Sequence, residues 1–358
     1  MSTVDRAAVP LFEHHADAAA QTASLYPRIR YMGSKYKLLP HLGKVFSEVG
    51  GQTALDAFSG SGVVSYLLKR QGFAVTANDM LEFPGVLASA TVVNNSTLLT
   101  ADDIERITGR AADDRDFIRK TFAGVFFSPD DLAFLDSAWS HISAMDGDKR
   151  ALAISALVLS AARKQPRGVF TISGDLSSYD DGRRDLRMSM RDHFIEHAGD
   201  YNRAVFAGPL AQVTRQEAAQ METRSYDLVY LDPPYAPPSD DNCYIKRFHF
   251  LEGLSRYWDG DKLMMHTRTK KLPKPVTGYS NKRTIVEAFR DTFKRFRDTG
   301  AIVLSYGSNA LPDKETITSL LLEVKRDVEV HAVPHTYHYG THQTAARRSV
   351  DEYIFIAR

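Results

Sequence analysis

The stretch from Tyr226 to Tyr235 constrains the fold of this chain more than any other. Its apolar run Leu228–Leu231 is short and lacks polar alternation, which is typical of a strand buried on both faces of a parallel sheet. The strand is followed by Asp232 and then by two prolines. Because proline cannot continue a hydrogen-bonded ladder and favours extended backbone before it, we predict Asp232 at the carboxyl end of a strand, in a stiffened loop. Ligands of open α/β sheets bind just outside that edge.

The tetrad Asp232-Pro233-Pro234-Tyr235 suits an amine attached to an aromatic ring. Such an amine is a poor nucleophile because its lone pair is delocalised into the ring. If Asp232 and the carbonyl of Pro233 each accept one N–H, the lone pair leaves the ring plane, and Tyr235 offers a face on which a flipped base can stack. A proline-rich loop after a core strand is the structural alternative, and the tetrad alone does not decide between the two.

A strand, turn and helix pattern near the amino terminus predicts a nucleotide-binding unit. The strand ends at Asp56, and the turn contains Gly60 and Gly62 but no third glycine. A carboxylate at that strand end can meet a cationic amine, which favours S-adenosylmethionine over NAD. The next predicted strand, 73–77, is followed by Asp79, about 20 residues after the turn, where an acidic side chain binds ribose hydroxyls.

The segment upstream of this unit carries a second candidate ligand site. Gly33 and Ser34 precede a helical pattern over 38–46, and Lys35 lies beside them. Free backbone N–H groups, a capping hydroxyl and an ammonium suit a carboxylate or phosphate. An ordinary capped helix with an exposed lysine is the simpler interpretation of the segment taken alone. Residues 1–24 lack clear periodicity, and we expect them to form a flexible arm.

Residues 84–203 are predicted to be mainly helical and to interrupt the sheet. The stretch 150–162 is apolar nearly all round, as expected of a buried helix. Basic residues follow it and can neutralise backbone phosphates or read base edges, although neighbouring aspartates dilute their charge. These candidate DNA-binding residues are Arg163, Lys164, Arg167, Arg183, Arg184 and Arg187.

The carboxyl-terminal part is predicted to complete the sheet. We expect a strand around 204–206, a helix over 282–297, a strand over 301–306 and a helix over 314–324. The pattern from 328 to 356 indicates a final antiparallel hairpin. The expected division is therefore a catalytic domain made of 25–83 and 204–358, with 84–203 inserted.

Composition limits the classes of function. The 45 basic and 44 acidic residues nearly balance, so any contact with nucleic acid depends on local positive charge. The single cysteine, Cys243, excludes an internal disulfide and fits a reducing compartment. No secretory leader, membrane-spanning run or metal-ligand spacing is evident, so we expect a cytoplasmic protein without a membrane partner or a metal.

Four motifs in order resemble the alpha-class, or Dam-type, adenine-N6 DNA methyltransferases, a class with many restriction–modification enzymes. They are Tyr31-Met32-Gly33-Ser34-Lys35, the run from Asp56 to Gly62, Asp79, and Asp232-Pro233-Pro234-Tyr235. The resemblance covers about 28–79 and 205–358, and residues 84–203 match the target-recognition insert in position and size. It implies an α/β, Rossmann-like methyltransferase fold: a mostly parallel seven-stranded sheet, a carboxyl-terminal antiparallel hairpin and an inserted helical target-recognition lobe.

The resemblance also implies an activity and a set of site residues. The activity is transfer of a methyl group from S-adenosylmethionine to the N6 amine of a flipped adenine in duplex DNA, by direct in-line displacement. The catalytic residues are then Asp232, Pro233, Pro234 and Tyr235. The implied cofactor-binding residues are Tyr31, Gly33, Ser34, Lys35, Asp56, Phe58, Gly60, Ser61, Gly62, Asp79 and Asp232, and Gln216 or Glu217 is the suggested contact to the cofactor's adenine.

Several alternatives remain at this level. Cytosine-C5 methylation needs an activated thiolate nucleophile, but Cys243 does not follow a proline and no neighbouring residue marks it as activated. Cytosine-N4 methylation uses the same pocket logic, and only Asp rather than Ser before the prolines favours adenine, by resemblance. An NAD-dependent oxidoreductase predicts a third glycine, and a non-catalytic DNA-binding module needs no cofactor loop. The expected partners are double-stranded DNA and a cognate restriction endonuclease, with the chain acting as a monomer.

Overall fold

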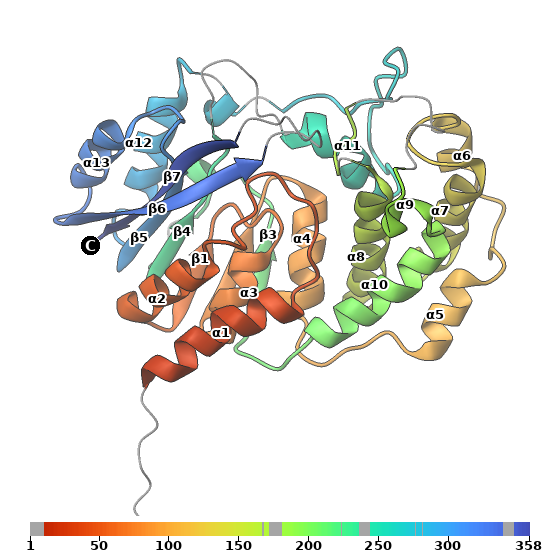
Figure 1. Ribbon diagram of the computed structural model, residues 1–358, viewed down its shortest axis with the longest axis horizontal. Helices are drawn as coiled ribbons and strands as arrows, with labels where there is room; N and C mark the ends of the chain where they lie inside the picture. Colours follow the sequence, from red (N-terminus) through yellow and green to blue (C-terminus); the bar gives the residue numbers. More distant parts are fainter. Residues whose placement is uncertain are drawn as a thin grey trace, which may run out of the picture.

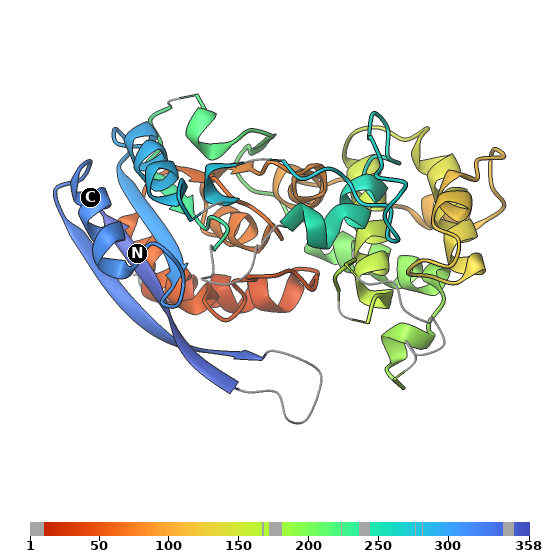
Figure 2. The ribbon, with the colours of Figure 1, turned by 90° about the horizontal axis from the view of Figure 1, so that it is seen from above.

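The computed structural model describes residues 11–166, 168–171, 181–222, 224–235, 244–275, 277–280, 282–338 and 347–358. A twisted sheet with helices on both faces forms one half of the molecule, and a lobe of helices lies beside it (Figures 1 and 2). Within these residues no helix combines the length and the apolar character that a bilayer span requires.

The sheet has seven strands in the order β3-β2-β1-β4-β5-β7-β6. β7 runs antiparallel to both β5 and β6, and the other neighbours are parallel. The predicted architecture, a mostly parallel sheet that ends in an antiparallel hairpin, is therefore confirmed. The strands are β1 (Thr53–Asp56), β2 (Ala74–Asn78), β3 (Gln212–Thr214), β4 (Leu228–Leu231), β5 (Ala301–Gly307), β6 (Val328–His338) and β7 (Arg347–Ala357).

One strand lies elsewhere than we predicted. Residues 204–206 are not a strand, because Ala204 is the last residue of a helix and its carbonyl accepts a hydrogen bond from the Tyr66 hydroxyl. The ring of Phe206 is half-buried and lies under the cationic groups of Lys69 and Arg70. The edge strand β3 follows at Gln212–Thr214 instead.

Alternate side chains of β4 enter the two layers of helices. Leu228 and Tyr230 pack with one cluster, and Val229 and Leu231 with the other, so every residue of this strand is buried. This explains the continuous apolar run of the sequence. The first layer holds α1 (Leu11–Leu25), α2 (Leu39–Val49) and α3 (Val63–Arg70), and the second holds α12 (Ile285–Arg295) and α13 (Lys314–Leu322), with the short turns η3 (Ala218–Gln220) and η4 (Gly278–Ser280) beside it.

The amino-terminal segment differs from the flexible arm expected over 1–24. Residues 11–25 form α1, and Ala18, Ala19 and Thr22 of this helix are buried. The small side chains let α1 lie close to the sheet half, yet they give only a weak hydrophobic period, which is why the pattern did not predict the helix. Residues 1–10 lie outside the described part of the chain.

The helical lobe is built around α8, whose residues from Leu152 to Ala162 are all buried, as the sequence predicted. Its core also includes residues after the predicted insert, among them Phe250, Trp258 and Leu272, so the lobe is not confined to 84–203. The elements are α4 (Glu82–Ala88), the π-helix η1 (Ser89–Val93), α5 (Ala101–Thr108), α6 (Phe117–Thr121), α7 (Pro129–Ile142), α8 (Gly147–Lys164), α9 (Arg184–Arg187), α10 (Met190–Ala204) and α11 (Tyr244–Leu254).

The order of strands places three carboxylates at one edge of the sheet. β1 and β4 are adjacent and parallel, and connections leave them in opposite directions, which makes their boundary the topological switch point. Asp56 pairs with Tyr230, two residues before Asp232. Asp79 directly follows β2, the other neighbour of β1. Asp56, Asp79 and Asp232 thus leave the sheet at the same carboxyl edge.

Candidate functional site

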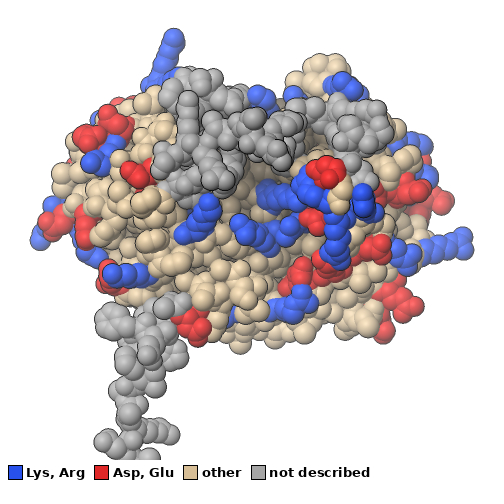
Figure 3. All heavy atoms as spheres, viewed as in Figure 1, with Lys and Arg blue, Asp and Glu red and all other residues tan. Residues whose placement is uncertain are grey.

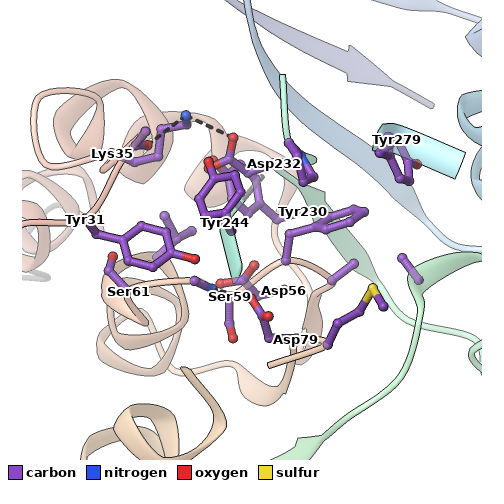
Figure 4. Close-up of a pocket in the computed structure, with 18 of the residues that line it drawn as sticks. Tyr31, Lys35, Asp56, Ser59, Ser61, Asp79, Tyr230, Asp232, Tyr244 and Tyr279 are labelled. Atoms are coloured by element: carbon purple, nitrogen blue, oxygen red, sulfur yellow. Dashed lines mark hydrogen bonds and ion pairs between the residues drawn. The ribbon is translucent and has the colours of Figure 1, made fainter. Parts of the chain in front are cut away.

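A cavity lies outside this edge of the sheet and joins the motifs predicted from the sequence (Figure 4). All of the predicted cofactor residues line it except Gly62. Of the tetrad, Asp232 and Pro234 line it, as do both candidates for the third motif, Gln216 and Glu217. The remaining described lining residues are Ala57, Ser59, Val63, Val64, Met80, Ala218, Tyr230, Tyr244, Thr277 and Tyr279.

The turn after β1 requires its two glycines for different contacts. Both adopt positive φ angles, +49° at Gly60 and +81° at Gly62. A Cβ at Gly60 would lie 2.9 Å from the ring of Tyr31, and one at Gly62 would lie 2.4 Å from the hydroxyl of Tyr26. The Asp79 carboxylate accepts the N–H of Gly60 at 3.0 Å. Asp79 therefore fixes the turn on which a ligand would rest.

Asp56 is a buried carboxylate, and one of its two oxygens has no hydrogen-bond partner in the described residues. Its Oδ2 accepts a hydrogen bond from the Ser65 hydroxyl at 2.6 Å, whereas Oδ1 is buried without a partner in the described residues. Burial raises the pKa of Asp56 to about 7. The buried hydroxyls of Ser59 and Ser34, which also line the cavity, have no partner either. Unsatisfied polar atoms are costly, so the cavity is shaped for a polar ligand that satisfies them.

At the opposite end of the cavity, the Lys35 ammonium lies between two carboxylates, those of Asp232 and Glu352, and Figure 4 shows its contact with Asp232. Its Nζ lies 2.9 Å from Asp232 Oδ1 and 3.1 Å from Oε1 of Glu352, and it donates to the Tyr235 hydroxyl at 2.8 Å. Burial raises the pKa of Asp232 to about 6, Lys35 lowers it and Glu352 adds to the rise. Burial disfavours the Lys35 cation, but Asp232 and Glu352 together hold its pKa well above the usual value.

Tyr235 is oriented from three sides, although it does not line the cavity. Its hydroxyl donates to Glu352, and its ring meets the ring of Tyr306 edge-on at 4.8 Å. A Cβ at Gly307 would lie 3.1 Å from the Tyr235 ring, so a glycine there keeps room for it. On the other side of the cavity, Tyr31 stacks on Phe248 at 5.0 Å with an interplanar angle of 3°.

Glu352 is a site residue that the sequence analysis missed. It lies on β7 and is 1% exposed. The signal was present: Val350, Glu352, Ile354 and Ile356 lie on one face of the strand and are all buried, and a single carboxylate occupies one of these positions. A charged side chain at an inward position of a core strand predicts a buried partner. The partner, Lys35, is more than 300 residues away, so pattern alone could not identify it.

The predicted DNA-binding residues differ in their exposure and in their partners. Arg163 and Arg183 lie near Asp185, but Lys164 is mostly buried and bonded to Asp131 at 3.3 Å, which departs from the expectation of a DNA-facing lysine. Lys164 also donates to the carbonyl of Met188, so it ties α8 to the segment before α10. Arg184 pairs with Glu196 on the surface, Arg187 ends α9, and Arg167 lies outside the described residues.

Comparisons with known proteins match this chain to one family model and to several methyltransferases. A family model described as D12 class N6 adenine-specific DNA methyltransferase matches residues 31–168. The type II methyltransferase M2.HphI of Haemophilus parahaemolyticus is 30% identical over 327 residues, which cover 87% of this chain and 92% of that protein. The modification methylase StsI of Streptococcus sanguinis is 24% identical over 91% of this chain, and the type II methyltransferase M.FokI of Planomicrobium okeanokoites is 22% identical over 91%. The chain spans about half the length of these last two proteins, 51% and 52%.

Proposed function

This chain belongs to the D12 class of N6 adenine-specific DNA methyltransferases, and we propose that Asp232 presents the target amine to S-adenosylmethionine held on the Gly60 turn. The observation that carries the proposal is that Asp232 and Gly60 line the same cavity. The activity itself is methylation of adenine N6 in DNA. The alternative of cytosine-N4 methylation receives no support from the family model or from the relatives.

The cavity suits S-adenosylmethionine because its unpaired polar atoms match a charged, hydroxylated donor. Asp56 would face a cationic group of the donor, and Asp79 would accept its ribose hydroxyls. Tyr31 and Lys35 would enclose the methionine end, and Gln216 or Glu217 would contact the donor's adenine. When bound, the donor supplies a methyl group on a sulfonium cation, which is electrophilic without further activation.

Asp232 makes the adenine amine nucleophilic by accepting one of its N–H groups, and the carbonyl of Pro233 accepts the other. This arrangement turns the nitrogen lone pair out of the ring plane. As the new N–C bond forms, the bond from the donor's sulfur to the methyl group breaks and the donor leaves as a neutral thioether. The nitrogen becomes cationic and loses one proton, which the ionised Asp232 carboxylate is placed to take. Tyr235 supplies the ring against which the flipped base packs, and the base leaves the duplex at a cost of a few kcal/mol.

Lys35 and Glu352 act as positioning residues for Asp232 and Tyr235. The Lys35 ammonium lowers the pKa of Asp232 against burial, which keeps that carboxylate ionised near neutral pH. Glu352 holds both Lys35 and the Tyr235 hydroxyl. The two carboxylates and one ammonium thus form a buried cluster whose geometry is fixed before any substrate arrives.

We assign target recognition in duplex DNA to the helical lobe, with 84–203 as its main part. The lobe lies beside the carboxyl edge of the sheet, where it can contact the strand that enters the cavity (Figure 2). The relatives carry the names modification methylase and type II methyltransferase. By analogy we propose that this chain acts as a monomer in a restriction–modification system whose endonuclease shares its target sequence.

The decisive test of the proposed reaction is transfer of label from methyl-labelled S-adenosylmethionine to unmethylated plasmid DNA, followed by nucleoside analysis. We expect the label in N6-methyladenine. Label in N4-methylcytosine would assign the pocket to the other exocyclic amine. Absence of transfer to DNA, with donor binding intact, would contradict the assignment of duplex DNA as the substrate.

Donor binding is expected to strengthen with pH because Asp56 must be ionised to meet a cation. With a pKa of about 7, this carboxyl is mostly protonated at pH 6 and mostly ionised at pH 8, so affinity should rise about tenfold across that range. Binding near pH 7 should also release a proton, which calorimetry in buffers of different ionisation enthalpy measures. In Asp56→Asn both effects should disappear. A wild-type affinity that is flat between pH 6.5 and 8 would show that the Asp56 carboxylate does not face the cation.

A further inference from the structure

A second hollow adjoins the catalytic cavity and is basic. It encloses about 500 Å³ and is lined by Arg28, Ile29, Arg30, Tyr31, Ser34, Tyr36, Lys37 and Arg163, which we call the basic groove. Tyr31 and Ser34 line both hollows, so one layer of side chains separates them. Figure 3, which shows the molecule from the same side as Figure 1, has Lys and Arg side chains gathered in the middle, between the sheet and the helical lobe.

The arginines in and beside the basic groove outnumber the carboxylates that form ion pairs with them in the described residues. Arg30 and Arg163 share one carboxylate, Asp185, at 3.1 Å and 3.6 Å. The nearby Arg183 has its own partner, Asp181, at 2.7 Å. Arg28 is exposed, lies 5.0 Å from the centroid of the Tyr36 ring and forms no ion pair with any carboxylate in the described residues.

The electrostatic consequence of this crowding appears at Arg30, which feels both Arg183 and Arg163. Burial and the neighbouring Arg183 and Arg163 lower its pKa, although Asp185 opposes the shift. An anion in the groove would relieve that repulsion. One buried donor of a residue that lines the groove, the Arg163 Nε, lacks a partner in the described residues.

Arg30 is also held rigidly at the junction of the two halves. Its guanidinium donates to the carbonyl of Gln165 at 3.2 Å, at the carboxyl end of α8. A Cβ on Gly168 would lie 2.8 Å from the Arg30 Cβ, so the chain after α8 passes directly against this side chain. A fixed guanidinium loses little entropy when it binds an oxyanion, and its planar donors suit phosphate.

We propose that the basic groove binds a backbone phosphate of the methylated strand, next to the target adenine. This inference rests on the proposed function, because the wall of Tyr31 and Ser34 shared by the two hollows places the phosphate beside a base that enters the cavity. Arg28 supplies an exposed donor to the phosphate oxygens, Arg163 supplies its unpaired Nε, and Arg30 supplies a guanidinium that is already held in place. The contact sets the register of the strand and carries no base information.

The test measures binding of the full chain to a short fluorescent duplex, which contains a site that the wild-type chain methylates, over a series of KCl concentrations. Arg28→Ala should reduce the slope of log Kd against log salt by about 1, and Arg28→Lys should retain it. Arg297→Ala is the matched control, because Arg297 is an exposed arginine just before β5, at the opposite edge of the sheet. Thermal unfolding of each variant should match the wild-type chain.

A neutral methylphosphonate placed at single positions locates the contact. At the phosphate beside the target adenine it should weaken wild-type binding about tenfold and weaken Arg28→Ala clearly less, because Arg30 and Arg163 remain in that variant, whereas distant positions should affect both proteins equally. Identical salt slopes for Arg28→Ala and Arg297→Ala, or equal losses at every phosphate, would overturn the proposal. Failure of the proposed function is separable: the wild-type chain would then transfer no methyl group, yet the salt slopes, measured on an unmethylated duplex of arbitrary sequence, would still report on the groove.

Discussion

Asp232→Asn should lower the single-turnover rate of adenine methylation by about 10³-fold while donor affinity changes less than severalfold. The amide is nearly isosteric with the carboxylate, so the loop and the cavity should persist. The amide cannot accept the proton that the amine loses. Its NH2 group replaces one carboxylate oxygen and is a donor, as is the amine that it would face. The rate is measured with labelled donor on plasmid DNA, and donor affinity by calorimetry.

A matched control lies at the other end of the same strand. The Asp227 carboxylate accepts the N–H groups of Gln52 and Thr53 at 2.8 Å and 2.9 Å, far from the cavity edge of β4. Asp227→Asn should reduce stability slightly and leave the transfer rate near the wild-type value. If Asp232→Asn retained a tenth of wild-type activity, or if both variants lost equal activity, Asp232 would not be the group that activates the amine.

Local pattern predicted most of the fold because its key elements are short and strongly marked. The run Leu228–Leu231 is apolar on both faces of the sheet, and Leu152–Ala162 is buried all round, so each has few alternatives. The errors fell where tertiary contacts outweigh pattern. The helix α1 packs through small side chains, and Ala204, which the pattern placed in a strand over 204–206, is the last residue of a helix.

The residues of the candidate site also divide into those that local pattern predicted and those that depend on tertiary contacts. Asp56, Asp79 and Asp232 follow strands that are close in the sheet, so the strand order alone brings them together. Glu352 comes from the carboxyl-terminal hairpin, and Arg28 and Arg30 come from a loop that meets α8 only in the folded chain. Their importance depends on distances between segments that are remote in sequence, and no local period encodes such distances.

Lys35→Met and Glu352→Gln should move the pH dependence of methylation in opposite directions. Transfer requires ionised Asp232, so the rate should fall about tenfold for each pH unit below the Asp232 pKa, which is about 6 in the wild-type chain. Removal of the Lys35 ammonium takes away the charge that lowers this pKa, so the acid limb should shift to higher pH. Removal of the Glu352 charge takes away a contribution that raises it, so the acid limb should shift to lower pH.

Lys35→Met should also unfold more readily, because it leaves the Asp232 and Glu352 carboxylates buried without their shared cation. The loss of one partner from a buried charge cluster costs about 3 kcal/mol, measurable by chemical denaturation. In the double variant Lys35→Met with Glu352→Gln, only one carboxylate remains, so part of the stability should return and the acid limb should lie below that of Lys35→Met. If Lys35 and Glu352 only brace the fold, the rates would fall in both single variants without any movement of the acid limb. The direction of the shift, rather than the loss of rate, therefore identifies the ammonium as the group that keeps Asp232 charged.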